Sequence, residues 1–112
     1  MVPNERVRLF IVSEGSYGAT KPIFACDRSP RFGVRVFVYV DRATREQGRM
    51  FVMFRKGHGD LVVGAAASDS ALAPVRARLG DSVDQYDVAE VPILVEPPDH
   101  AEQWKLRRRR RD

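Results

Sequence analysis

The alternation that decides the fold reads GVRVFVYV at residues 33–40 and RMFVMFRK at residues 49–56. Successive side chains of a β-strand point to opposite faces, so each stretch predicts a strand with two unlike faces. In both stretches one face is purely apolar. The other face combines arginine with aromatic and apolar residues, namely Arg35, Phe37, Tyr39, Arg49, Phe51, Met53 and Arg55.

The same pattern occurs a third time, over residues 5–12. Val7, Leu9 and Ile11 share one face of this predicted strand. The opposite face carries the set Arg6, Arg8 and Phe10. Because chance alternation rarely repeats in three segments, we expect all three to present arginine and aromatic side chains on a common side of one sheet.

Strand and turn signals along the rest of the chain predict an α+β fold. Its sheet is mostly antiparallel, a curved sheet or open barrel of four to six strands in the order β-β-β-β-α-β. Glycine, proline and serine make residues 13–32 rich in turns, with a short strand over 23–26. Residues 41–48 are polar and are expected to join the two central strands, so that 33–67 forms a three-stranded antiparallel meander.

Two helices are expected. One lies near 69–79, where Leu72, Val75 and Leu79 form an apolar stripe, Pro74 suits the first turn and Gly80 ends the helix. A C-terminal helix is predicted near 99–110, since Asp99 and Glu102 have capping-box spacing. The last strand, over 88–95, contains Pro92, which indicates an edge position or a bulge.

The 112 residues suit a single β-rich domain over 1–104, followed by a basic tail at 105–112. Net charge is +6 over 1–56, −7 over 57–104 and +5 over 105–112, for a total of +4. No apolar run is long enough to span a bilayer, and the N-terminus lacks a signal-peptide pattern. The single cysteine, Cys26, fits a reducing compartment, so we expect an intracellular protein, cytoplasmic or nuclear, with no membrane partner.

A face of arginine and aromatic residues is typical of proteins that bind single-stranded nucleic acids, because rings stack on bases and guanidinium groups pair with phosphates. The sequence therefore predicts a small non-enzymatic nucleic-acid-binding protein, with single-stranded RNA or DNA as ligand. The predicted contact residues are Arg35, Phe37, Tyr39, Arg42, Arg45, Arg49, Phe51 and Arg55, together with Arg107, Arg108, Arg109, Arg110 and Arg111 of the tail.

Another class of function explains the same residues. The rings of Phe10, Phe37 and Phe51 equally suit a second buried layer or a subunit interface, which is the preferred interpretation for the rings taken alone. The chain would then be a homodimer or larger oligomer, such as a protein-interaction scaffold or a viral or phage accessory protein. Its basic tail would lie on an acidic segment such as 81–90.

Catalysis and metal binding find little support in the sequence. Cys26, His58 and His100 are the only thiol and imidazole ligands, and their spacing matches no zinc pattern. Residues 15–21 contain two glycines and a lysine but lack the spacing of a phosphate-binding loop. A Cys-His-Asp arrangement would need His58, which lies between two glycines in a turn. We expect no cofactor, no metal and no enzymatic activity.

Overall fold

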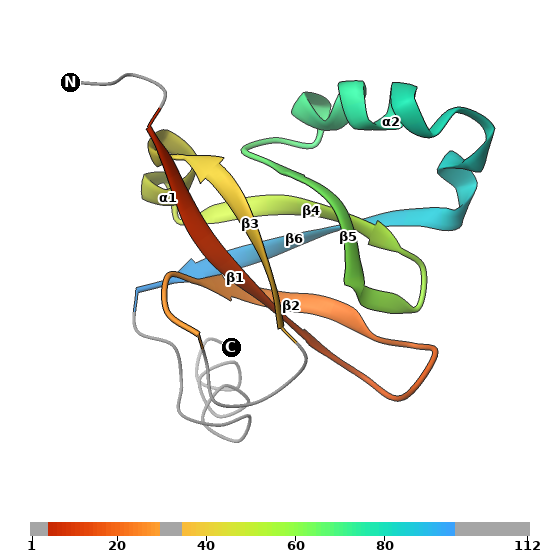
Figure 1. Ribbon diagram of the computed structural model, residues 1–112, viewed down its shortest axis with the longest axis horizontal. Coiled ribbons are helices and arrows are strands. Elements are labelled where there is room, and N and C mark those ends of the chain that lie inside the picture. Colours follow the sequence, from red (N-terminus) through yellow and green to blue (C-terminus); the bar gives the residue numbers. More distant parts are fainter. Residues whose placement is uncertain (1–4, 30–34, 96–112) are drawn as a thin grey trace, which may run out of the picture.

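The computed structural model describes residues 5–29 and 35–95. Six strands form one mixed sheet that curves into a nearly closed barrel, in the order β3-β1-β2-β6-β4-β5 (Figure 1). The strands are β1 (Arg6–Glu14), β2 (Lys21–Cys26), β3 (Arg35–Asp41), β4 (Arg49–Arg55), β5 (His58–Ala66) and β6 (Tyr86–Leu94). The helices are α1 (Arg42–Gln47), α2 (Ala73–Leu79) and the 3-10 turns η1 (Ser70–Leu72) and η2 (Gly80–Gln85).

This architecture confirms the predicted α+β class with a curved, mostly antiparallel sheet. β1 pairs antiparallel with β2 and β3, and β4 pairs antiparallel with β5 and β6. The two halves join where β2 runs parallel to β6, at Ala25 opposite Ile93 and Cys26 opposite Leu94. The predicted C-terminal helix near 99–110, the domain boundary at 104 and the basic tail lie outside the described residues.

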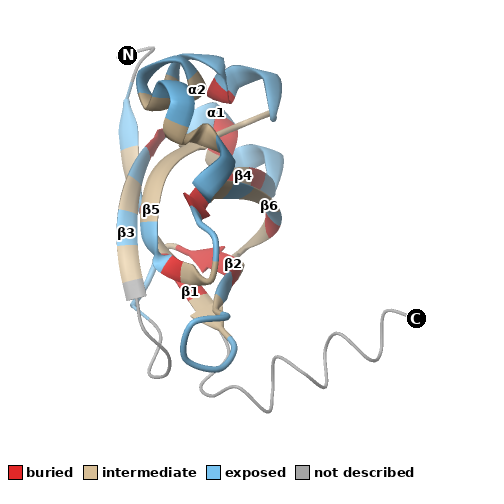
Figure 2. Ribbon diagram, turned by 90° about the vertical axis from the view of Figure 1, so that its right-hand side faces the viewer, coloured by how far each residue is buried: buried red, intermediate tan, exposed pale blue. Residues whose placement is uncertain are grey.

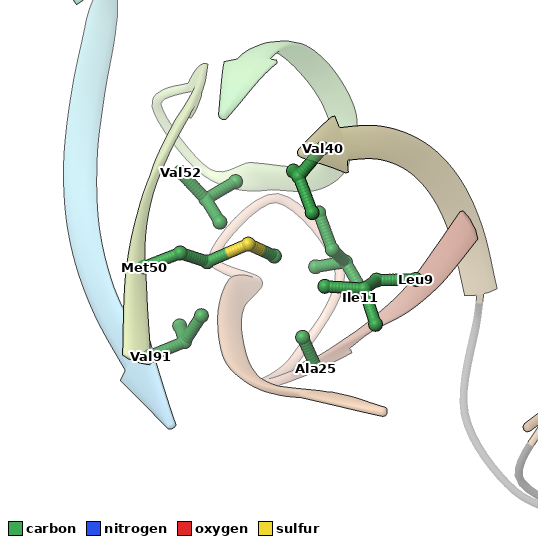
Figure 3. Close-up of a cluster of buried hydrophobic side chains, with 7 residues drawn as sticks. All are labelled: Leu9, Ile11, Ala25, Val40, Met50, Val52 and Val91. Atoms are coloured by element: carbon green, nitrogen blue, oxygen red, sulfur yellow. The ribbon is translucent and has the colours of Figure 1, made fainter. Parts of the chain in front are cut away.

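The core lies inside the barrel, where the aliphatic faces of the strands meet. Figure 3 shows side chains from five strands converging there: Leu9, Ile11, Ala25, Val40, Met50, Val52 and Val91. All seven are buried, and Val7, Val36 and Val38 pack against them. The aliphatic faces predicted for β1 and β3, and the Met50 and Val52 face of β4, therefore do point inward.

The connection between β3 and β4 is a correction to the predicted meander. Residues 42–47 form α1 rather than a polar loop, because Asp41 caps the helix and Gly48 ends it at φ +85°. The Thr44 hydroxyl (2.5 Å) and N–H (2.8 Å) both donate to the Asp41 carboxylate and hold its pKa below the usual range. The helix carries the chain away from β3, so β4 pairs with β5 and β6, and β3 lies at the far edge of the sheet.

The segment 70–79 is helical as predicted, with Pro74 in its first turn and Gly80 at its end. Most of α2 is exposed (Figure 2), but Leu72 and Val75 approach the outer side of β5. A Cβ on Gly64 would lie 2.8 Å from Val75 Cγ2, so glycine allows this close approach. Met53, the β4 partner of Gly64, is buried at 2% exposure on this covered side.

Pro92 does not lie on an edge strand, since β6 runs between β2 and β4. The pairing of β6 with β2 begins only at Ile93, one residue after the proline. Opposite Pro92 on the other side is Arg49 of β4. A central strand accepts this proline because the β2 ladder starts just beyond it.

Candidate nucleic-acid interface

The outer side of β1 and β3 carries a cluster of rings and guanidinium groups, which are exposed except for the half-buried ring of Phe10. The antiparallel register places Arg8 opposite Tyr39 and Phe10 opposite Phe37. We call this surface the aromatic face and define it as Arg6, Arg8, Phe10, Phe37 and Tyr39. Its members point outward because their neighbours Val7, Leu9, Val36, Val38 and Val40 fill the inside of the barrel.

Three rings of the aromatic face touch in a row. The centroids of Phe10 and Phe37 are 6.3 Å apart, and those of Phe37 and Tyr39 are 5.8 Å apart, both in edge-to-face geometry. Phe37 and Tyr39 are each 54% exposed, which is unusual for rings in a sheet this small. The pair therefore offers ring surface to a partner without any rearrangement of the barrel.

Arg8 lies against these rings. Its Cζ is 5.1 Å from the Phe10 centroid and 5.7 Å from the Phe37 centroid, within the range of cation–π attraction. No ion pair of Arg8 is found among residues 5–29 and 35–95. The rings thus position the guanidinium, and no carboxylate of the described residues occupies its donors.

Arg6, at one end of the aromatic face, is held differently. Its Nη1 donates to the Tyr39 carbonyl at 3.4 Å, and the residue opposite it in the register is Asp41. The charge of Arg6 contributes to the lowered pKa of Asp41, after the two hydrogen bonds from Thr44. Arg6 is exposed, but part of its field is offset by this carboxylate.

Three arginines of the predicted contact set are ion-paired. Arg42 of α1 contacts Glu5 at 2.5 Å, Arg45 of α1 contacts Asp27 at 2.6 Å, and Arg49 of β4 contacts Glu90. The pairs involving Arg42 and Arg49 are half exposed, and exposed pairs contribute only about 0–1 kcal/mol. Arg42 and Arg49 are therefore held weakly enough to exchange partners, whereas the Arg45–Asp27 pair is less exposed.

The β4 residues of the predicted set do not join the aromatic face. Phe51 is half-buried, with the Arg49 guanidinium 5.9 Å from its centroid, and Arg55 is exposed at the end of the strand. β2 and β6 lie between β1 and β4 in the sheet, so the two groups point outward in different directions. The expectation of one shared layer is wrong, because the sheet curls and α1 moves β4 away from β3.

The remaining predicted contacts fall where side chains are not described. Arg35 begins β3 opposite Val12, and its side chain is outside the described part, as are Arg107 to Arg111. Conversely, Arg6, Arg8 and Phe10 were part of the alternating pattern but not of the predicted contact set. Only the β1–β3 register, which alternation cannot supply, shows that they lie beside Phe37 and Tyr39.

Cys26 is an unsuitable nucleophile. It is fully buried, and burial raises its pKa to about 11, so the thiolate is scarce at neutral pH. Its Sγ–H donates to the Arg28 carbonyl at 2.9 Å. Within residues 5–29 and 35–95, no group of His, Cys, Asp and Glu side chains is arranged to hold a metal ion. None of the described helices has the length and apolarity needed to cross a bilayer.

No protein-family model, no curated protein and no solved structure matches the chain. The functional assignment therefore depends on the residues of the aromatic face themselves.

Proposed function

We propose that the protein binds single-stranded nucleic acid through the aromatic face, without catalysing a reaction. The observation that carries the proposal is the pair of half-exposed rings, Phe37 and Tyr39, beside the Arg8 guanidinium, which has no ion pair within the described part of the chain. Bases stack on such rings with little regard to sequence, and arginine donors meet the phosphates between them. In a duplex the bases are already stacked on each other, so a single strand is the better ligand.

The number of charges gives the proposal a salt dependence. Arg6 and Arg8 supply two phosphate contacts on the aromatic face, and each contact with a single strand adds about 0.7 to the salt slope. Arg42 on α1, which directly follows β3, extends the basic surface when its exposed ion pair with Glu5 opens. The arginine tail adds further contacts. We place the protein inside the cell, where Cys26 stays reduced.

The test is a fluorescence anisotropy titration of the full chain with labelled single-stranded and double-stranded probes of the same sequence, at about 50 and about 200 mM salt. We expect the single strand to bind more tightly, with an affinity that falls as salt rises. Equal affinity for both probes would contradict base stacking, and no binding to either at low salt would refute the proposal.

Exposed rings on an edge strand also suit a second copy of this chain. Sedimentation without nucleic acid measures this directly. A stable dimer that ignores the single-stranded probe would assign the aromatic face to a subunit interface instead.

A further inference from the structure

The two exposed rings of the aromatic face stand nearly at right angles to each other. The planes of Phe37 and Tyr39 make an angle of 86°, and those of Phe10 and Phe37 make an angle of 68°. Phe37 and Tyr39 offer most of the ring surface, since Phe10 is half-buried and the Arg8 guanidinium lies against it. A partner that stacks on both exposed rings therefore meets two perpendicular planes.

Contacts within the aromatic face hold this arrangement. Phe37 touches Phe10 and Tyr39 edge to face, and the Cζ of Arg8 lies 5.7 Å from its centroid. Aromatic pairs favour edge-to-face contact over a parallel sandwich, so turning the rings parallel would lose a preferred geometry. The face thus presents the same two planes before and after a ligand binds.

Stacking on both rings determines the shape of a bound strand. A base that stacks on a ring lies parallel to it, so the bases on Phe37 and Tyr39 are inclined to each other by the same 86°. Neighbouring bases of a stacked strand are instead parallel and about 3.4 Å apart. Consecutive bases on the two rings have therefore lost their stacking on each other.

The spacing of the rings also requires an extended strand. The centroids of Phe37 and Tyr39 are 5.8 Å apart along β3, which is longer than a stacked step of about 3.4 Å. Arg8 lies opposite Tyr39 in the register and beside the Phe37 ring. Its guanidinium is therefore close to both rings, where it is able to donate to the phosphate of the opened step.

We infer that the aromatic face selects pyrimidine runs over adenine runs. Opening the step between two bases costs most where the bases stack strongly, as adenines do, and least in flexible pyrimidine runs. The selection acts through this cost and needs no hydrogen bond to the edge of a base. This preference depends on the function proposed above and specifies its ligand, an unstacked and pyrimidine-rich single strand.

The test is fluorescence anisotropy of the full chain with labelled oligothymidylate and oligoadenylate of about 12 nucleotides, in the deoxy form and, with uracil for thymine, in the ribo form. Both strands carry the same number of phosphates, so at one salt concentration their phosphate contacts are matched. We expect the pyrimidine strand to bind about fivefold more tightly in whichever sugar form binds.

A third probe places two adjacent pyrimidines at the centre of the oligoadenylate. Because only one step has to open, this probe should recover most of the affinity of the pyrimidine strand. Affinity equal to that of the unmodified oligoadenylate would contradict selection at a single step.

Single-ring variants separate this geometry from a general preference for flexible strands. Phe37→Ala and Tyr39→Ala each remove one of the two exposed rings, so a base stacks on the other without opening a step. Both variants should bind more weakly and should hold the two strands within about twofold of each other. Leu61→Ala, which removes an exposed side chain of β5, should keep the wild-type ratio. Urea unfolding verifies that each variant is folded, and either ring variant alone suffices.

The outcomes distinguish this preference from the proposed function. Equal affinity for the two strands, tighter binding of oligoadenylate, or a fivefold ratio that persists in the ring variants would overturn the inference and leave single-strand binding intact. No binding of any probe at low salt would refute the proposed function, and the preference with it.

Discussion

Replacing Phe37 and Tyr39 together with alanine should abolish most of the affinity for a single strand. A ring that stacks on a base contributes about 1–3 kcal/mol by alanine substitution. Each ring is 54% exposed, so about half of its surface is available, and the lower part of that range applies. The two rings touch, so their contributions overlap. Together they should contribute about 2–3 kcal/mol, which corresponds to roughly 30- to 150-fold weaker binding.

The fold should tolerate this change. Both side chains lie outside the barrel core, and cross-strand contacts of this kind contribute about 0.2–1 kcal/mol each. The variant should therefore unfold cooperatively in urea with a modestly lower midpoint. Its salt slope should equal that of the wild type, because rings carry no charge.

The assay is anisotropy with a labelled single strand about 12 nucleotides long, within the site sizes seen for such surfaces. The matched control is Leu61→Ala, which removes a similarly exposed apolar side chain (48%) from β5. If the double variant binds within about twofold of the Leu61→Ala protein, the rings do not carry the binding and the reasoning is refuted.

The remaining predictions concern charge, backbone and pH. Arg8→Ala should lower the salt slope by about 0.7, whereas Arg49→Ala, whose guanidinium is ion-paired, should change it less; equal slopes in both variants would contradict the assigned roles. Gly57→Ala should destabilise the fold more than Gly48→Ala in urea unfolding. Both glycines have a positive φ, which costs an alanine about 1–3 kcal/mol, but only a Cβ at Gly57 would meet backbone, at 2.3 Å. Asp41→Ala should cost about 1 kcal/mol at pH 7 through loss of the N-cap. Since the N-cap hydrogen bonds lower the pKa of Asp41, this difference from wild type should be complete above about pH 4 and shrink as pH falls further; a constant difference in urea melts would contradict the capping role.

Local alternation predicts which residues of this chain point inward. Val36, Val38 and Val40 enter the core because a period of two is set by strand geometry alone. The helix over 70–79 is equally local, since Pro74 and Gly80 mark its ends. Alternation does not determine which strand lies beside which.

Which residues form the candidate site depends on the order of the strands in the sheet, which alternation does not give. Asp41 caps α1 and Gly48 ends it, so the segment predicted as a loop is helical. This helix separates β4 from β3, and the two strands lie far apart in the sheet order. Met53, which has the same pattern as Phe37, is consequently covered on the side of α2, while Phe37 stays exposed beside Arg8. The contact between the β1–β2 and β4–β5 turns is still less local, because Gly18 and Gly57 approach each other only when two separate turns pack.

The most direct measurement of the central claim is amide chemical-shift mapping of the labelled full chain during titration with a short single strand. The account predicts shifts concentrated at 6–10 and 36–41, the segments that carry the aromatic face, with small changes along β4 and α2. Shifts that spare 6–10 and 36–41 while the strand is bound would contradict it.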